Sequence, residues 1–259
     1  MFGINPFSLL SADVSPALMQ AFVIVMIAFV ALGTLFDLAH KRSAQYFFQH
    51  ARAVRGSRPV GGGERVALAF KTAVIDWLAA GEFCSTRRRF AHLLTMYGFL
   101  AYVISTIIQV FIYPAPDVET PAIWPMLWHL GALLVCLGGY WFWFFIRVDV
   151  SAEGHSPFRV VRADLFVLSL LANTTLALIW SWLLSSDSDW SEIALGLYLL
   201  SALVLFGSVP WSKFSHMFYK PAAAFQKRVE EANGSRANLP LPADVSAKLG
   251  SARTPPTHY

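Results

Sequence analysis

The sequence predicts an all-α integral membrane protein with five transmembrane helices, on the basis of its composition, its uncharged stretches and the distribution of its basic residues. The chain has 259 residues, of which 56% are apolar and only 14% are charged. Soluble domains are about 45 to 50% apolar and about 25% charged, so this composition indicates a lipid-facing surface. The 21 Phe and 9 Trp argue against a largely disordered chain, and the 2 Cys argue against a disulfide scaffold.

The spans are predicted from stretches of about 20 residues without charge, the length that crosses the hydrocarbon core of a bilayer. We expect them at about 14–38, 90–114, 121–146, 164–186 and 193–219. They form a membrane domain over 14–219, which an N-terminal segment, 1–13, precedes. No Lys or Arg precedes the first span, so we interpret it as a retained helix rather than a secretory signal. Pro210 is expected to kink the last span.

The basic residues predict the orientation, because short loops rich in Lys and Arg stay in the cytoplasm. Ten of the 20 lie between spans one and two, three between spans three and four, and seven after span five. The two other connections carry only acids. We therefore expect an outside N-terminus, a cytoplasmic C-terminus and a multi-pass protein of the bacterial cytoplasmic (inner) membrane. Charge sorted in this way accounts for the net charge of +4 with no nucleic acid as partner.

The cytoplasmic parts are a loop over 39–89 and a tail over 220–259. Between Glu64 and Ala80 the apolar residues gather on one helical face, which predicts a helix lying in the membrane interface. The tail is expected to begin as a short helix and then to become disordered, since it is rich in Pro, Ala and Ser. These parts form the expected docking face for a soluble partner, and contact with anionic lipid is the alternative.

Two histidines are the candidates for chemistry within the membrane domain. The uncharged stretches within the spans are 14–36, 90–116, 120–146, 165–186 and 193–212. They contain no Asp, Glu, Lys or Arg, which argues against a proton-coupled transporter. His92 lies at the cytoplasmic end of span two, and His216 follows the last uncharged residue of span five by about one turn. These spans run in opposite directions, so both imidazoles reach a similar depth and could ligate one haem iron. The alternative is that histidines and arginines near an interface simply snorkel toward water.

Further residues accompany this pair. The candidate contacts for haem propionates are Arg87, Arg88 and Arg89, and the candidates for packing against the macrocycle are Gly98 and Gly207. His40 lies at the same cytoplasmic level at the end of span one and is an alternative ligand. His129 lies in the outer half of span three, where we expect a hydrogen-bonded packing residue or part of a quinone pocket.

Two sequence blocks resemble a known family. They are Arg87-Arg-Arg-Phe-Ala-His-Leu-Leu-Thr-Met-Tyr-Gly-Phe99, which opens span two, and Pro210-Trp-Ser-Lys-Phe-Ser-His-Met-Phe-Tyr-Lys-Pro221, which closes span five. With the five spans, they resemble the cytochrome b membrane subunits exemplified by the gamma subunit of respiratory nitrate reductase. Relatives of that family include the membrane subunits of heterodisulfide-reductase-like complexes and of the quinone-interacting oxidoreductase that serves adenylylsulfate reductase. The resemblance covers about residues 14–228.

In that family, spans two and five each carry two axial histidines, so that two haems stack across the membrane. His92 and His216 match the cytoplasmic-side pair. The outer positions are ten residues after His92 and eighteen before His216, and here they are Tyr102 and Tyr198. The resemblance therefore implies either that the outer haem is lost and the inner one retained, or that haem is absent altogether.

The function implied by the resemblance is that of a membrane anchor and electron-transfer subunit. It would link a cytoplasmic iron–sulfur/flavin oxidoreductase, with adenylylsulfate reductase as the specific expectation, to membrane quinone through one haem b. The chain itself would be a non-catalytic subunit. The alternative is a haem-free anchor or scaffold for the same kind of partner. A transporter is disfavoured by the odd number of spans and by the absence of an internal repeat.

Overall fold

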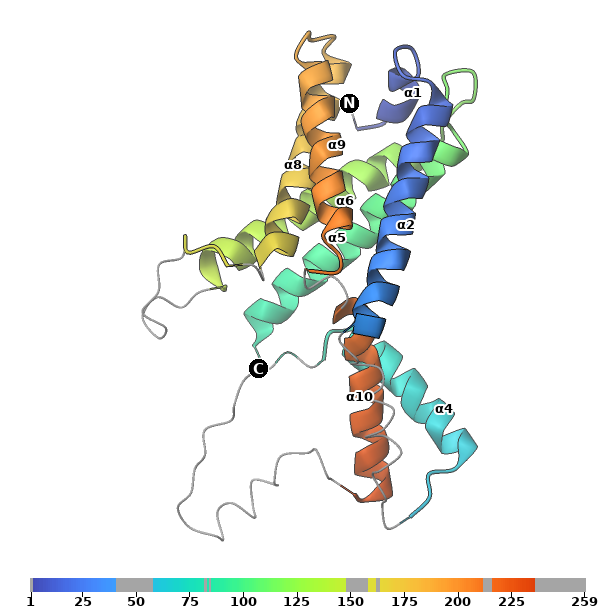
Figure 1. Ribbon diagram of the computed structural model, residues 1–259, viewed down its shortest axis with the longest axis vertical. Helices are drawn as coiled ribbons and strands as arrows, with labels where there is room; N and C mark the ends of the chain where they lie inside the picture. The colour runs from blue at the N-terminus through green and yellow to red at the C-terminus, as the bar shows by residue number, and fades with distance from the viewer. Residues whose placement is uncertain are drawn as a thin grey trace. The chain divides into compact units, whose positions relative to one another are not determined.

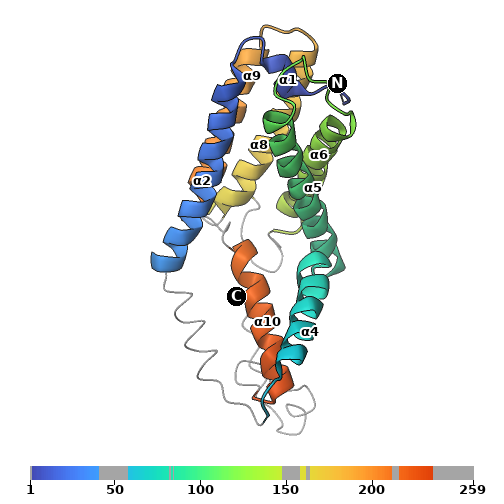
Figure 2. The ribbon, with the colours of Figure 1, turned by 90° about the vertical axis from the view of Figure 1, so that its right-hand side faces the viewer.

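The computed structural model describes residues 2–40, 58–81, 83, 85–147, 158–161, 164–211 and 216–235, with only the backbone at 38–40 and 216–220. All regular structure in these residues is helical, as predicted. Figures 1 and 2 show the helices, which are α1 (Pro6–Leu10), α2 (Pro16–His40), α4 (Gly62–Lys71), η1 (Thr72–Leu78), α5 (Thr86–Phe111), α6 (Ile123–Phe145), α8 (Leu165–Ser185), α9 (Ser191–Gly207) and α10 (His216–Asn233).

The chain divides into two compact units. The first, which we call the bundle, comprises Met1–Arg42 and Ala79–Met217 and contains α1, α2, α5, α6, α8 and α9. The second unit comprises Ser43–Leu78 and Phe218–Tyr259 and contains α4, η1 and most of α10.

Four helices of the bundle are long and apolar enough to cross a membrane. They are α5, α6, α8 and the Pro16–Asp37 part of α2, with mean hydropathies between 1.4 and 2.4. This finding confirms the prediction of a membrane protein with several spanning helices. The fifth expected span corresponds to α9, an apolar helix of 17 residues. At 1.5 Å per residue it is about 26 Å long, slightly less than the roughly 30 Å of a hydrocarbon core.

The last span differs from the prediction at its C-terminal end. A continuous helix is expected over 193–219, but α9 ends at Gly207, a turn occupies 208–211, and α10 begins at His216. The cause is Pro210, which has no N–H to donate and disfavours helical geometry at the residue before it. In the turn, the Trp211 N–H donates to the Ser208 carbonyl at 2.9 Å. Pro210 therefore lies beyond the end of the helix rather than at a kink within it.

Glycines bring α5 and α6 into backbone contact. A Cβ atom at Gly98 would lie 2.7 Å from the Gly131 carbonyl oxygen, and one at Gly131 would lie 2.6 Å from the Tyr102 backbone nitrogen. Farther along the same pair, a Cβ atom at Gly138 would lie 2.7 Å from the Ala91 carbonyl oxygen. Membrane helices lack a hydrophobic driving force for association, so such close approach is a main source of their packing energy. These glycines fix the register of α5 against α6.

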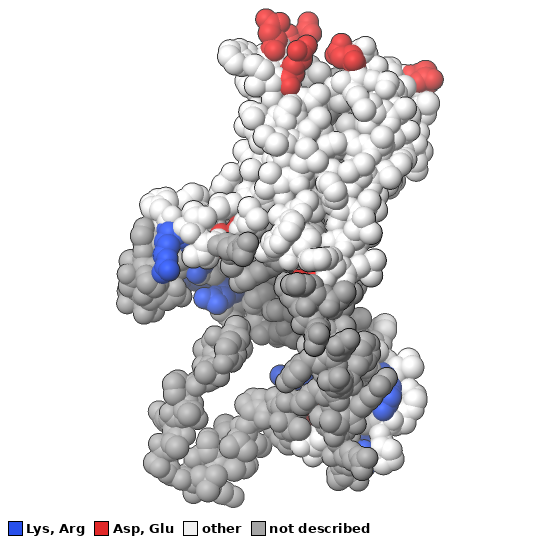
Figure 3. Space-filling view, in the orientation of Figure 1, with Lys and Arg blue, Asp and Glu red and all other residues white. Residues whose placement is uncertain are grey.

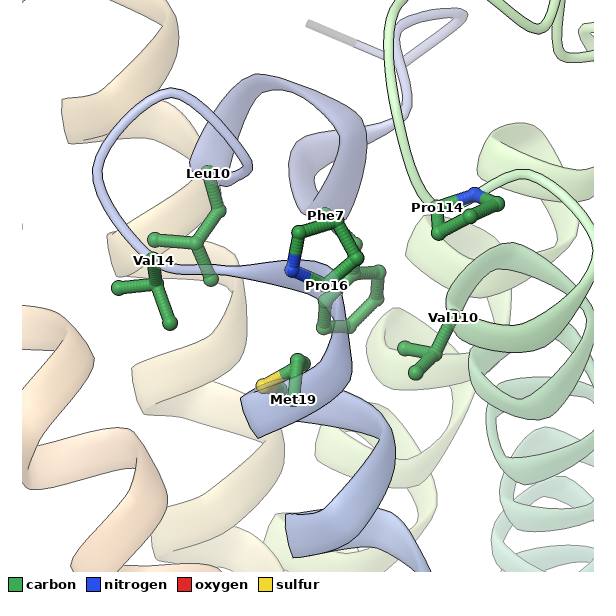
Figure 4. Close-up of a pocket in the computed structure, with 7 residues that line it drawn as sticks. All are labelled: Phe7, Leu10, Val14, Pro16, Met19, Val110 and Pro114. Atoms are coloured by element: carbon green, nitrogen blue, oxygen red, sulfur yellow. The ribbon is translucent and has the colours of Figure 1, made fainter.

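The short helix α1 closes one end of the bundle. The Asn5 side chain accepts from the Phe7 N–H at 3.0 Å and donates to the Tyr113 carbonyl at 2.8 Å, so it caps α1 and ties it to the end of α5. Phe7 then packs against Trp128 and Trp180, with ring centroids 5.7 and 5.5 Å away. Beside α1 lies a cavity of about 10 Å³, about the size of one water molecule. Figure 4 shows its apolar lining, which is Phe7, Leu10, Val14, Pro16, Met19, Val110 and Pro114.

Charges are sorted between the two ends of the bundle. The turn α5–α6 carries Asp117 and Glu119, the turn α8–α9 carries Asp187 and Asp189, and Glu192 lies in the first turn of α9. Figure 3 shows acidic side chains gathered at that end, with no Lys or Arg visible among them. At the other end, the first turn of α5 carries three arginines, and Arg147 follows α6. Arg147 Nε donates to Asp164 Oδ1 at 2.8 Å, which joins the end of α6 to the start of α8.

In the second unit, α4 and η1 form the helix that was expected over 64–80, although its second half is a π-helix. The expected helix at the start of the tail is present as α10. An ion pair fastens the two segments, because Arg228 Nε donates to Asp76 Oδ2 at 2.7 Å and Nη2 to Oδ1 at 3.0 Å. The expected disorder of the tail concerns residues after 235, which lie outside the described part.

Candidate functional site

Tyr102 of α5 and Tyr198 of α9 meet in the interior of the bundle. Their hydroxyl oxygens lie 2.8 Å apart, and both side chains are buried. The Tyr102 hydroxyl also donates to Asn173 Oδ1 of α8 at 3.2 Å. The Tyr102 hydroxyl is therefore the group that both hydrogen bonds share. Three helices are thus connected through one chain of hydrogen bonds.

The amide of Asn173 extends this chain toward α9. Its Nδ2 lies 3.1 Å from Ser201 Oγ, and Ser201 Oγ donates to the Tyr198 carbonyl at 2.6 Å. Asn173 is only 1% exposed, and a buried amide must be paired because no water is at hand in the bilayer core. The arrangement leaves both ends of the Asn173 amide bonded.

Aromatic rings enclose this polar chain. The Trp180 ring stacks on Tyr198 with centroids 5.5 Å apart, and the Trp128 ring lies 5.4 Å from Tyr102. Trp128 and Trp180 are both fully buried and touch edge to face. The Trp128 Nε1–H donates to Thr106 Oγ1 at 2.9 Å, so its polar edge is satisfied as well.

This packing leaves no room for a haem between the two tyrosines. A macrocycle would have to separate hydroxyl oxygens that are in hydrogen-bond contact and displace two indole rings. The residues at the outer positions of the family pattern therefore do not fit a haem. They form a closed contact among α5, α8 and α9 instead.

His129 of α6 is fully buried, and both of its ring nitrogens are engaged. Its Nδ1 lies 2.7 Å from the Pro125 carbonyl oxygen, and its Nε2 lies 2.8 Å from Ser181 Oγ. A carbonyl only accepts, so Nδ1 carries the hydrogen and Nε2 accepts from the serine hydroxyl. The ring also packs against Trp128 at 4.9 Å. Of the two expectations for His129, this geometry matches the hydrogen-bonded packing residue.

His92 lies in the second turn of α5, at the end of the bundle opposite the acidic turns. The Phe83 ring packs against its imidazole, with centroids 4.8 Å apart and planes at 42°. The three arginines before it are exposed, and Arg89 Nε donates to the Ala79 carbonyl at 2.8 Å. This bond ties Ala79 to the first turn of α5.

Only the backbone is described for the other two proposed ligands, His216 and His40. His216 is the first residue of α10, and His40 is the last residue of α2. The side chains of both lie outside the described part of the structure. Among the described residues, no group of three or more His, Cys, Asp or Glu could hold a metal ion. The pairing of His92 with His216 thus stays a prediction.

The two candidate glycines occupy different surroundings. Gly98 lies against α6, where its missing side chain allows the close approach to Gly131. Gly207 lies beside the Phe29 ring of α2, and a Cβ atom there would meet it at an ordinary 3.9 Å. A hollow of about 290 Å³ between α2 and the end of α9 is lined in part by Phe29, Gly207, Pro210 and Trp211.

Comparisons with known proteins give one distant similarity. Citrate utilization protein B of Escherichia coli is 27% identical to this chain over 168 residues. The similar region covers 62% of this chain and 42% of that protein, so the chain spans less than half the length of the relative. No family model matches the chain, and no solved structure matches it.

Sequence reasoning missed Asn173, Ser201 and Trp180, which complete the tyrosine contact. Besides charged groups and histidines, a neutral amide at the centre of an apolar span also indicates a site. Asp37 was also missed, because it directly follows the uncharged stretch of the first span. It is only 2% exposed, so the C-terminal part of α2 buries an acid.

Proposed function

We propose that the protein is a membrane anchor and electron-transfer subunit that links a cytoplasmic redox enzyme to membrane quinone. In this proposal α2, α5, α6, α8 and α9 all cross the bacterial cytoplasmic membrane. Four of them are long and apolar enough by themselves, and α9 has the shortest length that a span can have. The acidic turns at one end of the bundle and the arginines at the other support an outside N-terminus and a cytoplasmic C-terminus.

The observation that carries the proposal is the contact between Tyr102 and Tyr198. These residues are 96 positions apart, and the resemblance alone singled them out as the outer ligand positions facing each other from spans two and five. Their hydroxyls meet at 2.8 Å. The resemblance predicts that these two positions face each other, and the contact agrees with that prediction at this level of the bundle.

The proposal places an inner haem b at the cytoplasmic end, held by His92 and His216, which match the inner ligand positions of the family pattern. This placement rests on the pattern alone, because α9 ends at Gly207 and His216 begins α10. Neutral imidazoles are suitable axial ligands, and the haem would supply one-electron transfer between the soluble partner and quinone. His92 would be oriented by the Phe83 ring, and Arg87 and Arg88 extend from the first turn of the same helix with exposed side chains. With only an inner haem, electrons would not cross the full bilayer, because the outer position is filled by tyrosine and tryptophan.

The partner in this proposal is an iron–sulfur/flavin oxidoreductase, with adenylylsulfate reductase as the specific candidate. The similarity to citrate utilization protein B adds an enzyme of citrate use as a second candidate partner. Affinity purification of the full chain from its native membrane, followed by mass spectrometry, distinguishes these two partners. The alternative proposal is a haem-free anchor for the same kind of enzyme.

The deciding experiment is a dithionite-reduced minus oxidised visible spectrum of the purified chain, with the haem-to-protein ratio. We expect about one b-type haem per chain. His92→Ala and His216→Ala should each abolish it, whereas His40→Ala should leave it unchanged. Loss of haem in His40→Ala with retention in His216→Ala would instead identify His40 as the second ligand. A folded, colourless wild-type protein that still retains its partner would establish the haem-free anchor.

A further inference from the structure

The segment formed by α4 and η1 turns its polar side inward. Its less exposed residues are Glu64, Leu68, Thr72, Ala73 and Asp76. Four of these five recur every four positions, and three of those four are polar. Thr72 Oγ1 donates to the Leu68 carbonyl at 2.8 Å, and Asp76 pairs with Arg228 of α10. A helix that packs into a water-soluble domain normally turns its apolar side inward. Here the polarity is reversed.

The opposite side of the segment is apolar and exposed. Val66 is 70% exposed, Phe70 71% and Trp77 46%. Three further exposed apolar residues lie in η1, namely Val74, Ile75 and Leu78. A continuous apolar surface of this kind marks an interaction site rather than an ordinary water-facing surface.

Polar contacts within the second unit maintain this orientation. Arg228 binds Asp76 through two hydrogen bonds, and both side chains are largely buried. At the other end of the segment, Arg58 pairs with Glu64, and its Nε donates to the Ala232 carbonyl at 3.0 Å. Rotating the apolar side inward would break both sets of contacts. The apolar side is therefore available to an external apolar phase.

The position of the segment in the chain identifies that phase as lipid. Only residues 79–85 separate η1 from α5, a helix long and apolar enough to span a membrane. A fully extended linker of this length reaches about 29 Å, so the segment stays near the point where α5 enters the bilayer. Arg65 and Lys71 are exposed beside the apolar side chains, and they complement the negative charge of anionic headgroups.

We propose that residues 62–78 bind an anionic lipid surface, with Val66, Phe70 and Trp77 inserted at the boundary between headgroups and acyl chains. This is the binding mode of interfacial amphipathic helices, which lie in the membrane plane with the apolar side down. The proposal depends on neither haem nor electron transfer. It holds for the anchor with haem and for the anchor without it.

Depth measurements on the full-length protein test this proposal. A background with Cys84→Ser and Cys136→Ser receives a nitroxide label through Val66→Cys or Phe70→Cys, with Glu231→Cys on the exposed side of α10 as the matched control. The protein is reconstituted into phosphatidylcholine alone or phosphatidylcholine mixed with phosphatidylglycerol. We expect labels at 66 and 70 to collide more with oxygen than with a water-soluble nickel complex, and the label at 231 to show the reverse. Phosphatidylglycerol should deepen the first two labels.

Two outcomes would overturn the proposal. The first is that labels at 66 and 70 remain open to the nickel complex in both membranes. The second is that they become protected only when a soluble protein is added, which would make this face a protein-docking site. Trp77→Phe gives a readout without labels, because brominated lipids should quench less of the total tryptophan fluorescence in this variant than in the wild type. Equal quenching in both proteins would contradict insertion of Trp77.

Discussion

The hydroxyl of Tyr102 lies 2.8 Å from the hydroxyl of Tyr198, between two helices that are far apart in the sequence. The Tyr102 hydroxyl also lies 3.2 Å from Asn173 Oδ1. The two tyrosines are thus unequal. The Tyr102 hydroxyl is bonded to two side chains, whereas the Tyr198 hydroxyl is bonded to one.

This inequality predicts different costs for removing each hydroxyl. Tyr102→Phe leaves both the Tyr198 hydroxyl and Asn173 Oδ1 without their partner, so we expect the free energy of unfolding to fall by about 1 to 2 kcal/mol. Tyr198→Phe leaves the Tyr102–Asn173 bond in place and should cost about 0.5 kcal/mol. Unfolding titrations in mixed micelles measure both values. Tyr140→Phe, at a partly exposed hydroxyl bonded to Thr175, is the control. Equal costs for the two core variants would show that the Tyr102 hydroxyl is not shared between Tyr198 and Asn173.

The close contact of α5 with α6 predicts a sharp difference between glycines. Gly131→Ala places a Cβ atom 2.6 Å from the Tyr102 backbone nitrogen, which cannot move aside without shifting α5. We expect a loss of about 1 to 3 kcal/mol of stability. Gly196→Ala is the matched control, because nothing lies within 4 Å of its added methyl group and alanine favours the helix. The same unfolding titration measures both. A tolerated Gly131→Ala would show that the two helices are not in backbone contact.

The hydrogen bonds of His129 predict that it is a structural residue. His129→Ala should lower the free energy of unfolding by about 2 to 4 kcal/mol, because it removes a fully buried ring and leaves Ser181 unpaired. Ser181→Ala removes only one bond and should cost about 1 kcal/mol. Neither substitution should alter the reduced-minus-oxidised visible spectrum of haem-loaded protein. A spectral change in His129→Ala, at unchanged haem content, would place this histidine near the cofactor.

The sequence predicts the spanning helices well because each signal is local. An uncharged stretch of about 20 residues and its flanking charges need no tertiary contact to be recognised. The predicted end of the last span, at 219, is wrong because apolar residues continue past Gly207 and hide the end of the helix. Pro210 ends α9 because it has no N–H to donate. The sequence singles out Tyr102 and Tyr198 as matching positions but does not predict that they touch. The bond from Tyr102 to Asn173 and the stacking of Trp180 on Tyr198 depend on how three helices pack, which no single stretch of sequence encodes.

The ion pair between Asp76 and Arg228 predicts how the second unit holds together. The two side chains are only 12% and 19% exposed and make two hydrogen bonds, so salt should screen the pair weakly. Asp76→Ala removes two hydrogen bonds from a largely buried guanidinium, and we expect a loss of about 2 kcal/mol for local opening. Amide hydrogen exchange read by mass spectrometry should then rise about 30-fold in α4, η1 and α10, with α6 unchanged as the internal reference. Arg58→Ala, which breaks a more exposed pair with Glu64, should raise exchange much less. If exchange were unchanged in Asp76→Ala, the polar side of η1 would not be what fastens it to α10.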